Sequence, residues 1–185
     1  MDSMNSMNSM DPMDSMDEQS ADAKEERVVT LISADGKKFE VLRKHIVPFS
    51  VFIKTALTND PKADSMQLSK IFSEELARVI EFANKHKGKL PTETIKRPIS
   101  SLEAEKFVTH PWHATFINSM SVGKLNRLIM AANNLDCAPL MELCAAKIAA
   151  NLKLLAREAS QNKSDYKAGI KAYFDNPDFE VPPLN

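Results

Sequence analysis

The longest run of apolar residues at helical spacing lies in residues 125–152, towards the C-terminal end of the chain. Leucine, isoleucine and alanine recur there every three or four positions, and the pattern is interrupted at residues 136–139, Asp-Cys-Ala-Pro. Ser121 is a suitable N-cap for the first helix, and Pro139 is tolerated in the first turn of the second, where N–H groups lack helical partners. The pattern predicts two amphipathic helices joined by a tight corner. Because their apolar face is longer than one small core needs, we expect part of it to bind another protein.

Alternating apolar and polar positions nearer the N-terminus predict strands. Residues 27–42 form two such runs around Asp35-Gly36, a pair that favours a type I′ hairpin turn. The first run is apolar on both faces, which predicts an interior strand covered by helices on at least one side. Residues 66–71 predict a short third strand.

Capping residues mark further helices between these strands and the apolar segment. Ser50 predicts a helix over residues 51–57, and Ser73 with two following glutamates predicts a longer helix to about residue 86. Residues 85–98 are basic and contain glycine and proline, so they predict an exposed excursion.

The two ends of the chain have different patterns. Residues 1–26 are rich in Met, Asp and Ser, with methionine at every third position from Met1 to Met16, a period that fits neither a helix nor a strand. Their composition predicts a disordered tail. Near the other end, polar residues 156–163 precede a short helix predicted over about residues 165–174.

The formal net charge of -1 includes a strongly acidic N-terminus. Residues 1–23 carry a charge of -6, which leaves about +5 spread over the rest of the chain. This surplus is not the concentrated basic patch that a phosphate backbone requires, so we expect no nucleic-acid partner. No apolar run approaches the ~20 residues that span a bilayer, and the acidic N-terminus does not fit a signal or transit peptide, so we expect no membrane partner.

Residues that could carry chemistry are few. Cys137 and Cys144 lack the spacing of a zinc site and read as small buried apolar residues, and two reduced thiols suit a protein of the cytoplasm and nucleus. The histidines have no obvious nucleophile as partner, and His110 and His113 are better explained by packing beside Trp112 than by a metal. There is no glycine-rich phosphate loop. We therefore expect no enzyme, no cofactor and no metal site.

Five segments occur in an order that is typical of one family. They are LISADGKKFEV, SVFIKTAL, VIEFANKHKGKLP, a helix containing AAN-x-LD, and LMELCAAKIAANL. In this order they resemble the S-phase-kinase-associated protein one family, the adaptors of SCF ubiquitin ligases. The similarity covers about residues 28–155, with a weaker match at residues 170–179.

The resemblance implies an α/β fold, in which a BTB/POZ-like domain with a small, mainly three-stranded sheet and helices precedes a helical F-box-binding extension. We expect a tail over residues 1–26, the BTB/POZ-like domain over residues 27–137 and the extension over residues 138–185. In this family the domain binds a cullin and the extension binds the F-box motif of a substrate receptor. The resemblance thus implies a non-enzymatic adaptor of an SCF-type E3 ubiquitin ligase, acting in ubiquitin-dependent protein degradation.

Matching the chain to the family's motifs also implies site residues. The cullin-facing residues are Met130, Asn133 and Asn134, and Asn134 stands where the family usually has a tyrosine, which removes a large amphipathic contact. The F-box-binding residues are expected to be Leu140, Leu143, Cys144, Ile148, Leu152, Ile170, Phe174 and Phe179.

Two alternatives remain open from the sequence. Relative to the family, residues 153–162 are extra and the final Trp-Cys-containing helix is missing from this sequence. Together with Asn134, these departures motivate a self-associating BTB-type scaffold, a homodimer that would use the same surfaces. A transcription-linked BTB protein ranks last, because no zinc fingers or basic region accompany the domain.

Overall fold

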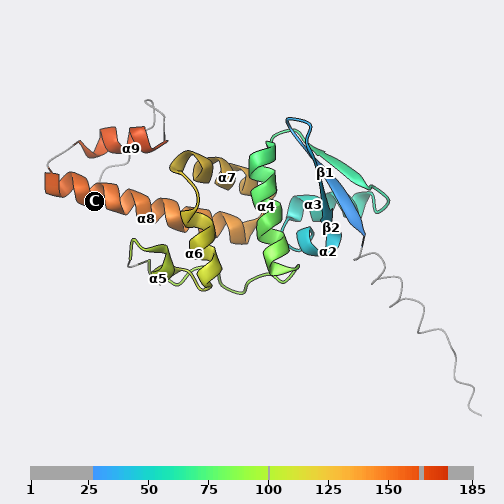
Figure 1. Ribbon diagram of the computed structural model, residues 1–185, viewed down its shortest axis with the longest axis horizontal. Coiled ribbons are helices and arrows are strands. Elements are labelled where there is room, and N and C mark those ends of the chain that lie inside the picture. Colours follow the sequence, from blue (N-terminus) through green and yellow to red (C-terminus); the bar gives the residue numbers. More distant parts are fainter. Residues whose placement is uncertain (1–26, 100, 163–164, 175–185) are drawn as a thin grey trace, which may run out of the picture.

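The computed structural model describes residues 27–99, 101–162 and 165–174 (Figure 1). The predicted tail over residues 1–26 lies outside the described residues.

A three-stranded sheet forms at one end of the molecule (Figure 1). Its strands are β1 (Val28–Ser33), β2 (Lys38–Leu42) and β3 (Ser65–Leu68). The order is β2-β1-β3, with β1 antiparallel to β2 and parallel to β3. Val29 and Leu31 on one face of β1 are fully buried, whereas Thr30 and Ile32 on the other face are half-buried. The prediction of an interior strand is confirmed, and its core side is the one covered by helices.

The hairpin turn between β1 and β2 differs from the prediction. Gly36 has a φ of +79°, but Asp35 is not left-handed, so the pair does not form the type I′ turn that we expected. Instead, the Gly36 N–H donates to the Ser33 carbonyl at 2.9 Å and the Ser33 N–H donates to the Lys37 carbonyl at 2.9 Å. A turn followed by one left-handed residue is the next most common hairpin closure, and glycine adopts that conformation without steric cost.

Eight helices are described, and those predicted after Ser50 and Ser73, on both sides of the corner, and near residue 165 are all present. In chain order they are α2 (Arg43–Ile46), α3 (Val51–Asn59), α4 (Ser73–His86), α5 (Ala104–Phe107), α6 (Pro111–Asn118), α7 (Val122–Asn134), α8 (Ala138–Asn162) and α9 (Tyr166–Phe174). The polar residues from 156 onwards, which we separated from the preceding helix, continue α8 to its end. In Figure 1, α8 runs away from the sheet and α9 lies along its far part.

One hydrophobic core joins the sheet to the helices. It runs through the chain from Val29 in β1 to Ala150 in α8. Phe49 and Phe82 meet edge to face near its centre, with ring centroids 5.7 Å apart. Because Leu140 in the first turn of α8 belongs to this same core, the boundary that we expected after residue 137 separates two helices but not two cores.

The segment predicted as an exposed excursion is mostly exposed, but the prediction was wrong for two residues in its second half. Thr94 and Ile95 are buried, and Ile95 forms an isolated antiparallel bridge with Val108. The Thr94 hydroxyl donates to Glu142 of α8 at 2.6 Å, and Arg97 forms an ion pair with the same carboxylate. The bridge and these contacts fasten the segment to the body.

The N-terminus of α4 is also capped differently from the prediction. Ser73 is the first residue of the helix and does not act as its N-cap. Its backbone N–H donates to Asp35 Oδ1 at 2.9 Å and its hydroxyl donates to Asp35 Oδ2 at 2.6 Å. Asp35 in the hairpin turn therefore caps α4 from a distant part of the sequence, and the hydrogen bond from Ser73 is the main cause that lowers the Asp35 pKa to about 2.

Among the described helices, none combines the length and the apolar character that crossing a bilayer requires.

Candidate functional site

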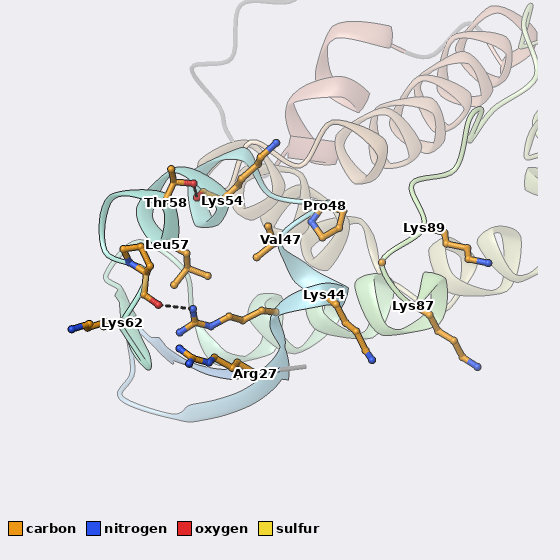
Figure 2. Close-up of a pocket in the computed structure, with 13 residues that line it drawn as sticks. Arg27, Lys44, Val47, Pro48, Lys54, Leu57, Thr58, Lys62, Lys87 and Lys89 are labelled. Atoms are coloured by element: carbon orange, nitrogen blue, oxygen red, sulfur yellow. Dashed lines mark hydrogen bonds between the residues drawn. The ribbon is translucent and has the colours of Figure 1, made fainter. Parts of the chain in front are cut away.

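A basic hollow of about 750 Å³ opens between α2, α3 and the end of α4 (Figure 2). Its lining includes none of the residues that the sequence predicted for the site. The predicted residues lie on α7, α8 and α9.

The corner between α7 and α8 is closed by backbone hydrogen bonds. Asp136 is left-handed, with a φ of +50°, and its N–H donates to the Asn133 carbonyl at 3.0 Å. The Cys137 N–H donates to the Ala132 carbonyl at 2.8 Å. These two bonds are those of a Schellman motif, which ends a helix and turns the chain sharply. The relative direction of α7 and α8 is thus set by the backbone itself.

The start of α3 is fixed against this corner. The Ser50 hydroxyl accepts a hydrogen bond from the Ile53 N–H at 3.1 Å and donates to the Leu135 carbonyl at 2.7 Å. The backbone N–H groups of Val51 and Phe52 point to the Asp136 and Leu135 carbonyls, each at 3.3 Å. The positive end of the α3 dipole therefore meets the negative end of α7, an arrangement that stabilises both helix ends.

Exposed apolar side chains gather around the predicted cullin-facing residues. Met130 is 61% exposed and lies one helical turn before the exposed Asn133 and Asn134. Phe72, just before α4, is 60% exposed and lines the same hollow of about 340 Å³ as Met130 and Asn134. We refer to the following residues together as the α7-end surface: Val51, Phe52, Phe72, Met130, Asn133 and Asn134.

Three members of this surface were not predicted from the sequence. Val51 and Phe52 are 55% and 47% exposed, and Phe72 joins them only because α4 packs against α7. One signal was present: α3 has an apolar stripe at Ile53 and Leu57 and a second one through Phe52. A short helix buries one stripe, so the second was available for another partner.

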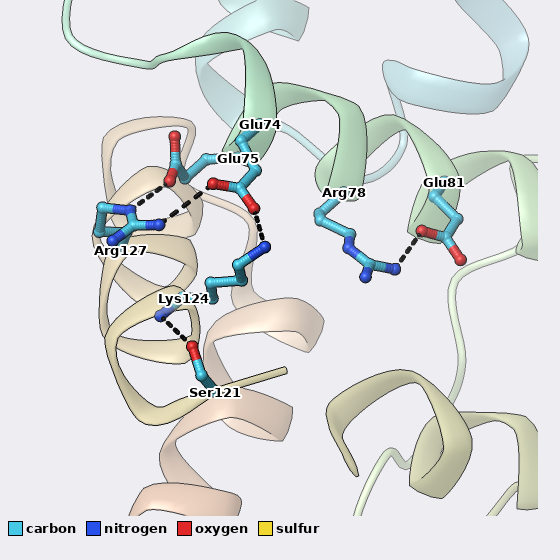
Figure 3. A network of polar contacts seen from close by, with 7 residues as sticks. All are labelled: Glu74, Glu75, Arg78, Glu81, Ser121, Lys124 and Arg127. Atoms are coloured by element: carbon cyan, nitrogen blue, oxygen red, sulfur yellow. Dashed lines mark hydrogen bonds and ion pairs between the residues drawn. The ribbon is translucent and has the colours of Figure 1, made fainter. Parts of the chain in front are cut away.

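An ion-pair network fixes α7 beside α4 next to this surface (Figure 3). Arg127 Nε lies 2.6 Å from Glu75 Oε1, and Arg127 Nη2 lies 3.1 Å from Glu74 Oε2. Lys124 forms an ion pair with Glu74 as well, and its hydrogen bond is the main cause that lowers the Glu74 pKa. Glu75 is buried, so its pairing with Arg127 avoids leaving an uncompensated charge under the surface.

The residues expected to bind an F-box divide into buried and accessible ones. Leu140, Leu143 and Cys144 are fully buried in the core. In this conformation their side chains offer no surface to a partner and support α8 from inside, so their contact with an F-box stays a prediction. Ile170 of α9 is also buried, where α9 packs against α7 and α8. Phe179 lies outside the described residues.

A half-buried apolar stripe remains along α8 and is available in part to a partner. Its members are Met141, Ile148, Leu152 and Leu155, whose spacing places them along one side of the helix. On α9, Phe174 is half-buried and packs edge to face on Tyr173, with centroids 5.1 Å apart. The Tyr173 hydroxyl accepts a hydrogen bond from Asn151 Nδ2 at 3.0 Å, which ties α9 to α8.

The arrangement offers little chemistry. Burial raises the pKa of Cys137 to about 11 and that of Cys144 to about 12, so both thiols stay protonated and unreactive at neutral pH. Among the described residues, no cluster of three or more His, Cys, Asp or Glu side chains is arranged to hold a metal ion. The surfaces above are suited to binding proteins.

Comparison with known proteins agrees with this arrangement. Residues 27–88, from β1 to just past the end of α4, match the family model described as "Skp1 family, tetramerisation domain". A similar curated protein is the S-phase kinase-associated protein 1 homolog of Tetrahymena thermophila. It is 30% identical over 125 residues, which cover 68% of this chain and 74% of that protein. The chain therefore belongs to the Skp1 family, as a divergent member in which a POZ domain precedes a helical region.

Proposed function

We propose that the chain is the adaptor subunit of an SCF-type E3 ubiquitin ligase, which bridges a cullin to F-box substrate receptors in ubiquitin-dependent protein degradation. Membership of the Skp1 family supports an adaptor-type role in general. Because its thiols are reduced and buried, we propose that it acts in the cytoplasm and nucleus.

The observation that carries the proposal is the α7-end surface. Phe72 and Met130 are large apolar side chains that stand mostly in solvent beside the amides of Asn133 and Asn134. The buried Oδ1 of Asn126, which lines the same hollow, has no hydrogen-bond donor within the described residues. Exposed apolar groups beside an unpaired acceptor are typical of a protein interface, because a partner can bury the first and donate to the second. We propose that a cullin binds here.

We propose that the F-box of a receptor binds along the α8 stripe and α9. Ile148 and Leu152 are the accessible members of the predicted set on α8, and Phe174 is the one on α9. This side lies beyond the corner from the α7-end surface, so one chain can hold both partners at once.

A pull-down from cell extract with the full chain tests the two assignments separately. Asn133→Lys should lose the cullin and keep F-box proteins, because it places a charge on the α7-end surface. Ile148→Asp should keep the cullin and lose F-box proteins, because it places a carboxylate in the α8 stripe. The matched controls are Asn59→Lys at the end of α3 and Ala149→Asp on α8, both exposed residues. Each variant is first shown to be folded by its circular dichroism melt.

Two outcomes of the pull-down would contradict the proposal. Recovery of neither a cullin nor any F-box protein by the unaltered chain would rule out the adaptor role. Loss of both partners by each variant would show that the two surfaces are not separate.

Self-association is a second candidate, which the description of the matching family model favours. In that case two copies bury Phe72 and Met130 against each other. Light scattering then shows a mass that rises with concentration, and Met130→Asp returns the chain to a monomer. A monomer at every concentration would exclude it.

A further inference from the structure

The basic hollow is lined by a concentration of positive charge (Figure 2). Its cationic side chains are those of Arg27, Arg43, Lys44, Lys54, Lys62, Lys87 and Lys89. The other lining residues are neutral, and Val47, Pro48 and Leu57 give it an apolar wall. Figure 2 shows Arg27 on one side of the hollow, with Lys44, Lys87 and Lys89 on the other. These residues are far apart in the sequence, which is why the positive charge appeared to be spread out when the chain was considered as a sequence.

Arg43 at the base of the hollow is not fully satisfied by the protein. The side chain is only 10% exposed. Its Nη1 donates to the Pro61 carbonyl at 3.0 Å, and its Nη2 donates to the Ala63 carbonyl at 2.5 Å and lies 3.4 Å from Asp64 Oδ1. The buried Nε has no hydrogen-bond partner within the described residues. A buried donor without an acceptor costs free energy, and the guanidinium adds its positive charge to that of the lysines lining the hollow.

The chain contains a segment of complementary composition that begins at the hollow itself. Residues 1–26 hold eight acidic residues and one lysine, a net charge of -7, which leaves +6 for the remainder out of the total of -1. The segment joins the body at Arg27, which lines the hollow and whose carbonyl accepts the Arg43 N–H at 2.8 Å. Its methionines, at every third position from Met1 to Met16, are flexible apolar side chains that adapt to an irregular wall.

We propose that the acidic N-terminal segment, residues 1–26, docks into the basic hollow of its own chain. Carboxylates of the segment accept hydrogen bonds from the lysines that line the hollow, and its methionines cover the wall formed by Val47, Pro48 and Leu57. Attachment at Arg27 makes the contact intramolecular, which raises the effective concentration of the segment at the hollow. While it is docked, the segment prevents acidic segments of other proteins from binding in the hollow. This inference does not depend on the adaptor role.

Paramagnetic broadening in the full chain tests the contact. A nitroxide attached to Ser9→Cys should broaden the amide signals of residues such as Val47 and Leu57 at low salt. Selective attachment is feasible because the native thiols are buried, with pKa values raised to about 11 and about 12. The broadening should disappear at about 1 M salt, where the Debye length falls to about 3 Å.

Charge reversal supplies the decisive comparison. Lys54→Glu with Lys62→Glu should abolish the broadening, because both lysines line the hollow. The matched control is Lys96→Glu with Lys106→Glu, the same change at exposed lysines near α5, which Figure 1 shows on the side away from α2. It should leave the broadening unchanged.

Three results would overturn the proposal. The first is no broadening around the hollow at low salt. The second is equal broadening in both double variants. The third is broadening that occurs only between a labelled and an unlabelled copy, since the segment would then dock on a second chain.

Discussion

At the scale of single residues, His113 shows how burial sets the charge of a side chain. The imidazole is 1% exposed, and its Nε2 lies 3.0 Å from Nε2 of His86. The ring stacks on Phe82, with centroids 5.8 Å apart. Burial, followed by the neighbouring His86 and His110, lowers the pKa of His113 to about 4, and burial is also the main cause that lowers the pKa of His86. His113 is therefore neutral in the folded protein at neutral pH.

This environment predicts a loss of stability in mild acid. Since the folded pKa of His113 lies below the unfolded value of 6.5, the unfolded chain binds more protons at pH values between about 4 and 6.5. The free energy of unfolding should fall across that range by on the order of 2–3 kcal/mol. Denaturant titrations at pH 7, 6 and 5 measure it. His113→Gln should reduce the pH dependence, and an unchanged slope in His113→Gln would contradict the assignment.

Asn134 is the residue where binding strength can be changed without touching the core. It is exposed at the end of α7, and a tyrosine there would add a large amphipathic side chain beside Met130. If a cullin binds the α7-end surface, Asn134→Tyr should raise its affinity by about tenfold, equivalent to about 1.4 kcal/mol. Calorimetric titration with the N-terminal repeat of a cullin measures this gain. The control Asn59→Tyr should show none, and an unchanged affinity in Asn134→Tyr would argue against this contact.

At the scale of elements, α4 is held at both ends by distant parts of the chain. Asp35 caps its N-terminus. At its C-terminus, Lys87 and Gly88 are left-handed, and Gly88 lies directly against the backbone carbonyl of Lys44 in α2. A side chain at Gly88 would collide with that carbonyl, so this glycine allows α2 and α4 to approach each other.

Two glycines with the same backbone conformation allow the cost of that conformation to be measured apart from the cost of the steric clash. Gly36 and Gly88 both have a φ of +79°, but a Cβ at Gly36 would meet nothing within 4 Å. Gly36→Ala should cost about 1–2 kcal/mol of unfolding free energy, from backbone conformation alone. Gly88→Ala should cost a further 1–3 kcal/mol, roughly, because it overpacks the contact with α2. Chemical denaturation measures both, and equal losses would show that the close approach does not matter.

What the sequence revealed about the elements depended on the range of the interactions. The caps at Ser50 and Ser121 and the corner after α7 were predictable, because their signals lie within a few residues. The cap of α4 by Asp35 and the bridge of Ile95 with Val108 were not, because neither partner signals the other locally. The same holds for the site: α7 carried its own motif, whereas Phe72 reached the α7-end surface only through tertiary packing.

At the scale of the whole molecule, a single core continues from the sheet into the first half of α8. The core-facing side chains of α8 reach Ala150, and beyond it α8 and α9 support each other through contacts such as that of Asn151 with Tyr173. The POZ domain and the start of the helical region are thus one structural unit, although different partners are proposed for them.

This continuity predicts cooperative unfolding. Differential scanning calorimetry of the full chain should show one transition, with equal calorimetric and van't Hoff enthalpies, because the core spans the boundary after residue 137. Leu143→Ala, a fully buried change in α8, should lower the midpoint of that whole transition, since truncating a core leucine costs about 2–5 kcal/mol. Two separate transitions, with only one of them shifted by Leu143→Ala, would show that the regions fold independently.

The corner at Asp136 fixes the angle between α7 and α8. α8 contains 25 residues, so at 1.5 Å per residue its far end lies about 37 Å from the corner. A change of about 10° in the angle between α7 and α8 would move that end by about 6 Å, with no change in either proposed binding surface. If the chain is the adaptor that we propose, the hydrogen bonds of the three-residue turn between α7 and α8 would then determine which parts of a substrate come within range of the distant enzyme.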